Sequence, residues 1–326
     1  MGGSSPIPAA CLSEQRRRFY GPVVRSEESV GNCPMSAAPC SRVSEGRRAL
    51  PFLVPTILIM GAINLYPFIN GMIRSLHSFR ILSQDFVYSG LRNFRLLFQD
   101  ELFWHAFGNS MTWVATCVSA QFVLAMILAM VLNSRELRAR RVVRTLVLIP
   151  WAMPPVVVAL MWRYVLADNG PMNLFLSMLG IGSPPSWLLD PQVALWACIL
   201  VTVWMNIPFM TVMLLAGLQS VEPSLYEAAA IDGANFLQST FRITLPVIKK
   251  VALVVITLMS IWTFNMFDVV YVLTNGGPGN ASLTLPLFAY QNAFFYYQMG
   301  YAAAVGILMM ACLLVLIFFY IRQVLE

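Results

Sequence analysis

The sequence is short of charged residues. Only 11% of its 326 residues are Asp, Glu, Lys or Arg, whereas a soluble protein carries about 25%. Lysine occurs only at positions 249 and 250, and histidine only at positions 77 and 105. The chain is 58% hydrophobic and has a mean hydropathy of +0.70. This composition is typical of a membrane protein and excludes an ordinary soluble enzyme.

Catalytic and metal-binding motifs are missing as well. The chain has no Gly-x-x-x-x-Gly-Lys-Ser/Thr phosphate loop, no His-Glu-x-x-His zinc pattern and no Gly-x-Ser-x-Gly nucleophile motif. Its six cysteines divide between apolar runs and a polar N-terminal segment, at spacings that suit neither a disulfide framework nor a metal site. We therefore expect a protein that is not an enzyme and that itself binds no metal and no cofactor.

The N-terminal segment, residues 1–46, lacks the apolar run of a secretory signal peptide. It is polar and contains Ser, Pro, Gly and Arg, which predicts a disordered cytoplasmic tail. Met35 lies shortly before the apolar part of the chain, so a second hypothesis is that translation starts there. N-terminal sequencing that finds residues 1–34 in the native protein would contradict that hypothesis.

Six apolar segments are long enough to cross a bilayer, which takes about 20 helical residues for a core of about 30 Å. They lie at about residues 50–75, 106–132, 142–166, 193–218, 247–273 and 301–321. We predict an all-α membrane protein in which residues 47–326 form one domain of about six transmembrane helices, with no soluble domain longer than its loops.

The positive charges indicate which ends of these helices face the cytoplasm. Of the 21 Lys and Arg residues, sixteen fall in the N-terminal tail, between the second and third segments, around the loop between the fourth and fifth, and after the sixth. Cytoplasmic loops carry such an excess, which predicts a multi-pass protein with a cytoplasmic N-terminus. Because topology accounts for the net charge of +6, we expect membrane lipid and not nucleic acid as a partner.

Residues 219–246, between the fourth and fifth apolar segments, have a different pattern. Pro223 suits the first turn of a helix, and the alanines 228–230 favour helix strongly. Gly233 tolerates the left-handed backbone that ends many helices. A second short apolar pattern follows, from Phe236 to Pro246. The segment is predicted to form a helix, a glycine turn and a second helix on the cytoplasmic side.

Seven positions of this segment fit the signature Glu-Ala-Ala, three residues, Gly, nine residues, Ile-x-Leu-Pro. They are Glu227, Ala228, Ala229, Gly233, Ile243, Leu245 and Pro246, and Asp232 directly precedes the glycine. Here the chain resembles the inner-membrane subunits of ABC importers. The resemblance implies a loop that docks into a groove of an ATPase subunit, with Glu227 facing a basic residue there. An ordinary helical hairpin between membrane spans is the alternative.

The resemblance continues from about residue 50 to about 322. The run Phe267–Pro278, which ends Thr-Asn-Gly-Gly-Pro, is similar to the fifth span of the carbohydrate-importing branch related to maltose and glycerol-phosphate permeases. The family implies a second permease subunit, a pair of ATPase subunits that use ATP and Mg, an external substrate-binding protein and a sugar substrate. It also implies a bacterial or archaeal cell membrane.

Five residues in the predicted spans are candidates for the substrate path, since polar groups within a membrane are costly and often functional. They are Asn206, Trp262, Asn265, Asp268 and Tyr271. On a continuous fifth helix, Asn265 and Asp268 would share one face, and the aromatic rings could stack on sugars. The alternatives are a hydrogen bond between helices for Asn206, outside water for Asp268, and interfacial anchoring for the two aromatic residues.

We therefore expect the transmembrane subunit of an ATP-driven, binding-protein-dependent importer that moves a sugar or sugar derivative into the cytoplasm by alternating access. The alternative is an ion-coupled secondary transporter acting without an ATPase, which should carry paired carboxylates near mid-membrane. The predicted spans hold one acidic residue, Asp268, near an end. The pattern leaves open which sugar is carried.

Overall fold

The structure is a computed structural model that describes residues 42–79, 86–134 and 140–325. The chain divides into two units, Met1–Ile59 and Met60–Glu326. Helix α2 (Arg42–Ser75) begins in the first unit and ends in the second, which contains every other element described below. Of the predicted N-terminal tail, residues 42–46 belong to α2, and residues 1–41, with Met35, lie outside the described residues.

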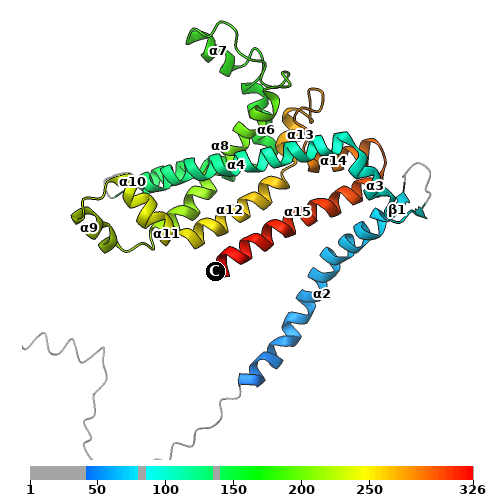
Figure 1. Cartoon of the computed structure of the whole chain (residues 1–326), viewed down its shortest axis with the longest axis horizontal. Coiled ribbons are helices and arrows are strands. Elements are labelled where there is room, and N and C mark those ends of the chain that lie inside the picture. The colour runs from blue at the N-terminus through cyan, green and yellow to red at the C-terminus, as the bar shows by residue number, and fades with distance from the viewer. Residues whose placement is uncertain (1–41, 80–85, 135–139, 326) are drawn as a thin grey trace, which may run out of the picture. The chain divides into compact units, whose positions relative to one another are not determined.

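Four helices of the described chain are long and apolar enough to cross a membrane. They are α2, α4 (Glu101–Asn133), α8 (Ala194–Leu218) and α15 (Met299–Leu325) (Figure 1). Two bent helix pairs raise the number to six if each pair is one span. The prediction of an all-α membrane protein is confirmed, and the small hairpin of strands β1 (His77–Phe79) and β2 (Phe86–Tyr88) is the sheet of the described part.

The third predicted span is sharply bent. It consists of α5 (Arg140–Ala152) and α6 (Pro155–Val165), whose described apolar parts meet at 91°. Pro154 and Pro155 stand at the bend, and Pro155 occupies the first turn of α6. Proline lacks a backbone N–H and cannot continue the hydrogen bonds of the preceding helix, so the bend follows from the sequence.

The fifth predicted span, 247–273, is not one continuous helix. Helix α12 (Lys249–Phe264) ends before Asn265, and α13 (Asp268–Leu273) starts after a break. At its other end, the helical segment Phe236–Val247 meets α12 at 77°. The predicted shared face for Asn265 and Asp268 is therefore wrong, because the two residues lie on opposite sides of a break.

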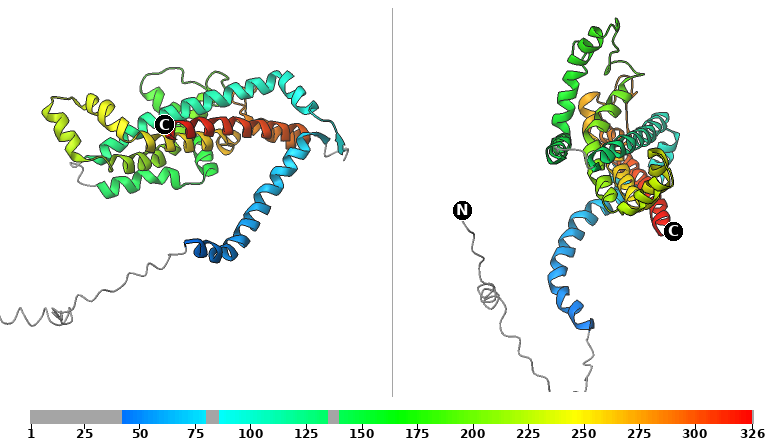
Figure 2. Two further views of the ribbon diagram at one scale, coloured as in Figure 1. Left: turned by 60° about the horizontal axis from the view of Figure 1, so that its bottom comes forward. Right: turned by 90° about the vertical axis from the view of Figure 1, so that its left-hand side faces the viewer.

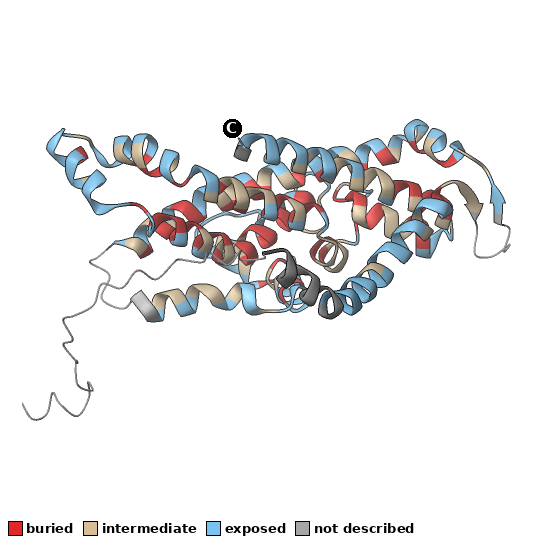
Figure 3. Ribbon diagram, turned by 90° about the horizontal axis from the view of Figure 1, so that it is seen from below, coloured by how far each residue is buried: buried red, intermediate tan, exposed pale blue. Residues whose placement is uncertain are grey.

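Helix α8 lies at the centre of the second unit. In its most apolar stretch of 18 residues, 67% of the residues are buried, whereas the corresponding share is 33% in α4 and 22% in α15. It packs on α4, α5 and α12, and α12 also packs on α15 (Figure 2). Figure 3 shows the buried residues, in red, gathered in the interior of the helix bundle. At Gly217 on α8, an added Cβ would lie 3.1 Å from Cγ1 of Val251. A glycine there lets α8 and α12 approach closely.

Short elements join the long helices. They are α3 (Arg92–Gln99), α7 (Pro171–Met178), α9 (Pro223–Ile231), α10 (Phe236–Ser239), the π-helix η1 (Thr240–Thr244), α11 (Leu245–Val247), α14 (Leu285–Tyr290) and the π-helix η2 (Gln291–Phe295). Helices α9 to α11 lie at one end of α8 and α12, and α13 lies at the other end of α12 (Figure 1).

Candidate functional site

The segment between α8 and α12, residues 219–246, is called the elbow here. Pro223 is at the first position of α9, and Gly233 has a φ of +75° directly after that helix ends. Both features agree with the sequence prediction, because this backbone conformation strains residues that have a Cβ. Helix α10 follows, and η1 and α11 carry the chain toward α12.

A capping box starts the second half of the elbow. The backbone N–H of Gln238 donates to Oδ1 of Asn235 over 2.8 Å, and the backbone N–H of Asn235 donates to Oε1 of Gln238 over 2.9 Å. The pair satisfies two donors at the helix start, which otherwise have no partner. The pattern Asn-x-x-Gln is visible in the sequence, yet the prediction did not use it.

A hydrogen bond joins the two halves of the elbow. The hydroxyl of Tyr226 on α9 lies 3.0 Å from Oγ1 of Thr244 at the end of η1. The Thr244 hydroxyl also donates to the carbonyl of Ser239 over 3.3 Å. The helices of the elbow are thus cross-linked through a side-chain pair that no local sequence pattern reveals, since its members are 18 residues apart.

The motif residues divide between the interior and the surface. Glu227, Ala228, Asp232 and Gly233 are exposed, whereas Ala229 is buried within the chain. Ile243 and Leu245 are half-buried and Pro246 is exposed. Ala229 is 7% exposed, so this motif residue already packs inside the chain.

Several large apolar side chains of the elbow are exposed. They are Leu225, Ile231, Phe236, Leu237 and Phe241, and Ile231 is the most exposed, at 87%. Ile231 and Phe241 lie outside the predicted motif positions. Together with the carboxylates of Glu227 and Asp232, these side chains form a surface that is apolar and acidic. Such exposed apolar surface indicates a site of interaction with another protein or with lipid.

The elbow also contacts the end of α4. A pocket of about 360 Å³ lies between Met130 and Asn133 of α4 and the elbow residues Tyr226, Ala234 and Thr240. The Thr240 hydroxyl is 3.8 Å from the sulfur of Met130. The elbow therefore contacts the end of a membrane helix across this pocket.

The break between α12 and α13 exposes Asn265. Its Nδ2 donates to the carbonyl of Ile261 over 2.8 Å, and it caps the end of α12. Asp268 begins α13 and is half-buried. The indole N–H of Trp113, on α4, donates to the carbonyl of Thr263 over 3.0 Å. Trp113 thus satisfies a carbonyl in the last turn of α12, next to the break, a contact that the sequence did not predict.

Asn206, a candidate for the substrate path, is buried. It is 5% exposed, and its Nδ2 donates to the carbonyl of Thr202 in its own helix over 2.9 Å. Nε2 of Gln121, on α4, donates to the same carbonyl over 3.3 Å. Asn206 therefore belongs to a polar contact between α4 and α8, inside the chain.

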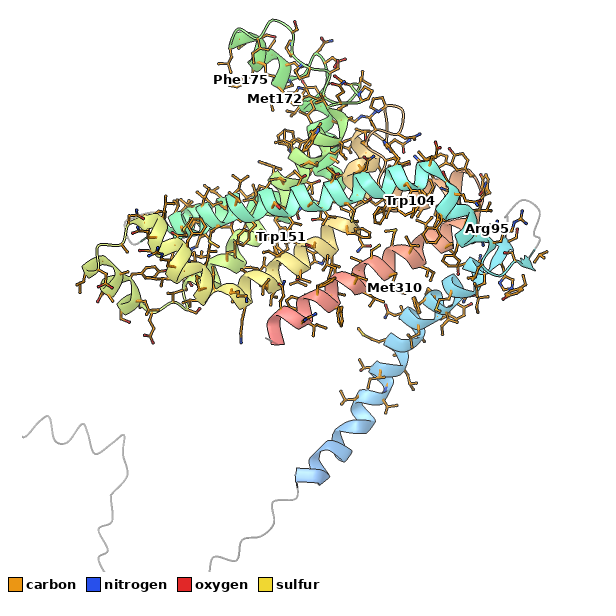
Figure 4. All side chains as sticks on the ribbon, viewed as in Figure 1. Arg95, Trp104, Trp151, Met172, Phe175 and Met310 are labelled. Carbon is orange, nitrogen blue, oxygen red and sulfur yellow. The ribbon has the colours of Figure 1, made fainter. Side chains whose placement is uncertain are left out.

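Trp262 and Tyr271 belong to two separate aromatic groups. The ring centroid of Trp262 is 4.9 Å from that of Phe209, which is 5.3 Å from that of Trp151 (labelled in Figure 4). The Tyr271 ring instead stacks on Phe267 at 4.9 Å. The structure thus places Trp262 with two aromatic residues that the prediction missed. In the described part of the chain, no group of three or more His, Cys, Asp or Glu could hold a metal.

Comparison with known families identifies what kind of protein carries this elbow. Residues 121–325, which include the elbow, match the family described as the binding-protein-dependent transport system inner membrane component. The chain belongs to this family. It is the permease component of such a system, as the Glu-Ala-Ala signature had indicated. No finding supports the alternative of an ion-coupled transporter.

Individual relatives agree with the family. The permease is 36% identical over 276 residues to the trehalose/maltose transport system permease protein of Thermococcus litoralis, covering 84% of this chain and 92% of that protein. It is 33% identical over 279 residues to the lactose transport system permease protein of Rhizobium radiobacter, covering 83% of this chain and 93% of that protein.

Solved structures agree with the fold. The permease matches a chain of a bacterial ABC transporter involved in the import of the acidic polysaccharide alginate, with a TM-score of 0.73, 26% identity, and coverage of 86% of this chain and 96% of that one. A bacterial alginate ABC transporter in complex with an alginate pentasaccharide-bound periplasmic protein also matches, with a TM-score of 0.71, 26% identity, and coverage of 85% of this chain and 94% of that one.

Proposed function

We propose that this permease is the membrane subunit of an importer for a sugar or oligosaccharide, driven by separate ATPase subunits that bind ATP and Mg. The observation that carries the proposal is the elbow, whose helices are cross-linked and whose outer surface is apolar and acidic. A rigid exposed surface of this kind suits a partner that must pass on mechanical movement. The relatives named for trehalose, maltose and lactose support a carbohydrate substrate.

The elbow would lie in the cytoplasm, where ATP is available. Sixteen of the 21 Lys and Arg residues support this orientation. A second permease subunit would complete the path, and an external binding protein would deliver the sugar, as the alginate structure with its periplasmic protein suggests. The ATPase pair would close on ATP, move both elbows and tilt the membrane helices between two openings.

The substrate path would follow exposed groups near the break in the fifth span. The candidates that remain accessible are Asn265, Asp268 and the ring of Trp262, beside Phe209 and Trp151. Aromatic faces suit the apolar faces of sugar rings, and amide and carboxylate groups suit their hydroxyls. Asn206, which is buried, would instead support this surface from behind.

The test is a transport assay on the assembled complex. Cells that express the permease with its neighbouring ATPase, second permease and binding-protein genes are expected to take up at least one of labelled maltose, trehalose and lactose. Gly233→Asp should leave the permease in the membrane but abolish co-purification of the ATPase or uptake, because a side chain is strained at a φ of +75°. Gly182→Asp, at an exposed glycine outside the elbow, is the control. Normal uptake by Gly233→Asp would contradict docking at the elbow.

A further inference from the structure

A second pocket lies at α13, beyond the end of α12 that is distant from the elbow. It has a volume of about 400 Å³ and is enclosed by the end of α6, residues 188–189 and α13 with the residues after it. Its polar lining residues are Arg163, Asp168, Tyr271, Thr274 and Asn275. Neither the break at Asn265 nor the Trp262 group contributes to it.

The chemistry of this pocket is mixed rather than of one sign. Arg163 offers donors, Asp168 offers acceptors, and the amide of Asn275 and the hydroxyl of Tyr271 offer both. A sugar needs this combination, because each of its hydroxyls both donates and accepts. A pocket that bound a charged side chain of another protein would instead offer mainly groups of the opposite charge. The volume is within the usual range of small-molecule sites, about 300 to 1,000 Å³.

The pocket is connected to the proposed substrate path through α13. Nη1 of Arg163 donates to the carbonyl of Val272 over 3.3 Å, so the pocket wall is tied to this short helix. The Tyr271 ring stacks on Phe267 at 4.9 Å with an interplanar angle of 19°. Phe267 lies in the break itself, between Asn265 and Asp268. A ligand that contacts Tyr271 is therefore one aromatic ring away from the break.

We propose that this pocket, formed by Arg163, Asp168, Tyr271 and Asn275, is a receiving site that holds a mono- or disaccharide after the binding protein releases it and before it reaches the break. The site rests on the proposed function, because it needs a sugar delivered to this end of the permease. It adds a binding step at the outer mouth, with Tyr271 as the stacking ring and Asp168 as the hydroxyl acceptor.

The test compares variants in purified complexes in proteoliposomes. Tyr271→Leu removes the ring, Asp168→Ala removes the carboxylate, and Ala167→Trp fills the pocket while keeping its polar groups. Each should lower the uptake rate of maltose, trehalose or lactose at saturating loaded binding protein by about three- to tenfold, the effect of one lost aromatic contact or hydrogen bond. Tyr164→Leu is the matched control, because Tyr164 is 72% exposed on α6 and does not line the pocket.

A second measurement separates sugar binding from protein docking. The affinity of the loaded binding protein for the complex in nanodiscs should be the same in all four variants as in the wild type. A weaker affinity that matches the loss of uptake would make the pocket a docking surface and overturn the proposal. Unchanged uptake in Ala167→Trp would overturn it as well. A wild-type complex that transports none of the three sugars would overturn the sugar-import function itself.

Discussion

At the scale of single residues, two glycines of α15 differ in what surrounds them. A Cβ on Gly300 would overlap the carbonyl oxygen of His77 and lie 3.2 Å from the Arg74 carbonyl and from Nδ2 of Asn93. That Asn93 amide donates to the carbonyls of Ser75 and His77, over 2.7 and 3.0 Å. Gly300 therefore allows α15 to contact the end of α2 and the start of β1.

We expect Gly300→Ala to destabilise the permease by about 1–3 kcal/mol, the usual cost of overpacking. The melting temperature in detergent should fall by about 2–4 °C for each kcal/mol. Gly306→Ala on the same helix is the control, because nothing lies within 4 Å of its added Cβ. An equal loss of stability in both variants would show that the close contact at Gly300 is not the cause.

Single residues also differ in how far their environment can be predicted from the sequence. Gly233 was predicted correctly because the need for a left-handed conformation is local. Asn206 was a candidate for the substrate path, with a polar contact between helices as the alternative, and Ala229 was a motif residue; both are buried. Their burial depends on which neighbouring helix covers them, and an apolar run with no polar face carries no information on that.

At the scale of elements, the elbow depends on the hydrogen bond between Tyr226 and Thr244. We expect Tyr226→Phe, which keeps the ring, to lower uptake by about two- to tenfold, since a hydrogen bond contributes about 0.5–1.5 kcal/mol. The ATP hydrolysed per sugar transported should rise, because a loosened elbow would pass on less of the partner's movement. Uptake and ATPase rates of the same proteoliposomes measure both effects.

A double-mutant comparison assigns that loss to the bond itself. Thr244→Val should resemble Tyr226→Phe, and the double variant should be little worse than either single one, because each removes the same contact. Thr244→Val also removes the bond to Ser239, so we expect it to lower uptake more than Tyr226→Phe does. Fully additive losses would mean that the two hydroxyls act separately.

The elements also show which breaks in a helix can be predicted from the sequence. The bend between α5 and α6 coincides with Pro154 and Pro155, and the positions of these prolines were visible in advance. The break between α12 and α13 has no proline or glycine at residues 265–267. It is held by tertiary contacts, of which the bond from Trp113 to the Thr263 carbonyl is one, so only the folded chain reveals it.

At the scale of the whole molecule, the two proposed sites need opposite sides of the membrane. Helix α12 has 16 residues, which span about 24 Å at 1.5 Å per residue, and the elbow and the receiving pocket lie beyond its two ends. If the elbow meets an ATPase inside, the pocket opens outside. The Lys and Arg bias supports this orientation. The proposed transport cycle requires the elbow inside and the pocket outside.

Cysteine labelling tests the orientation directly. Ser224→Cys in the elbow and Ser183→Cys between α7 and α8 both replace exposed residues, in a background with Cys11, Cys33 and Cys40 changed to alanine. A membrane-impermeant maleimide should label Ser183→Cys in intact spheroplasts and Ser224→Cys only in inside-out vesicles. The background alone should label weakly, because Cys117 and Cys198 are buried and Cys312 is partly buried. Labelling of Ser224→Cys from outside would put the elbow out of reach of ATP and end the case for an ATP-driven importer.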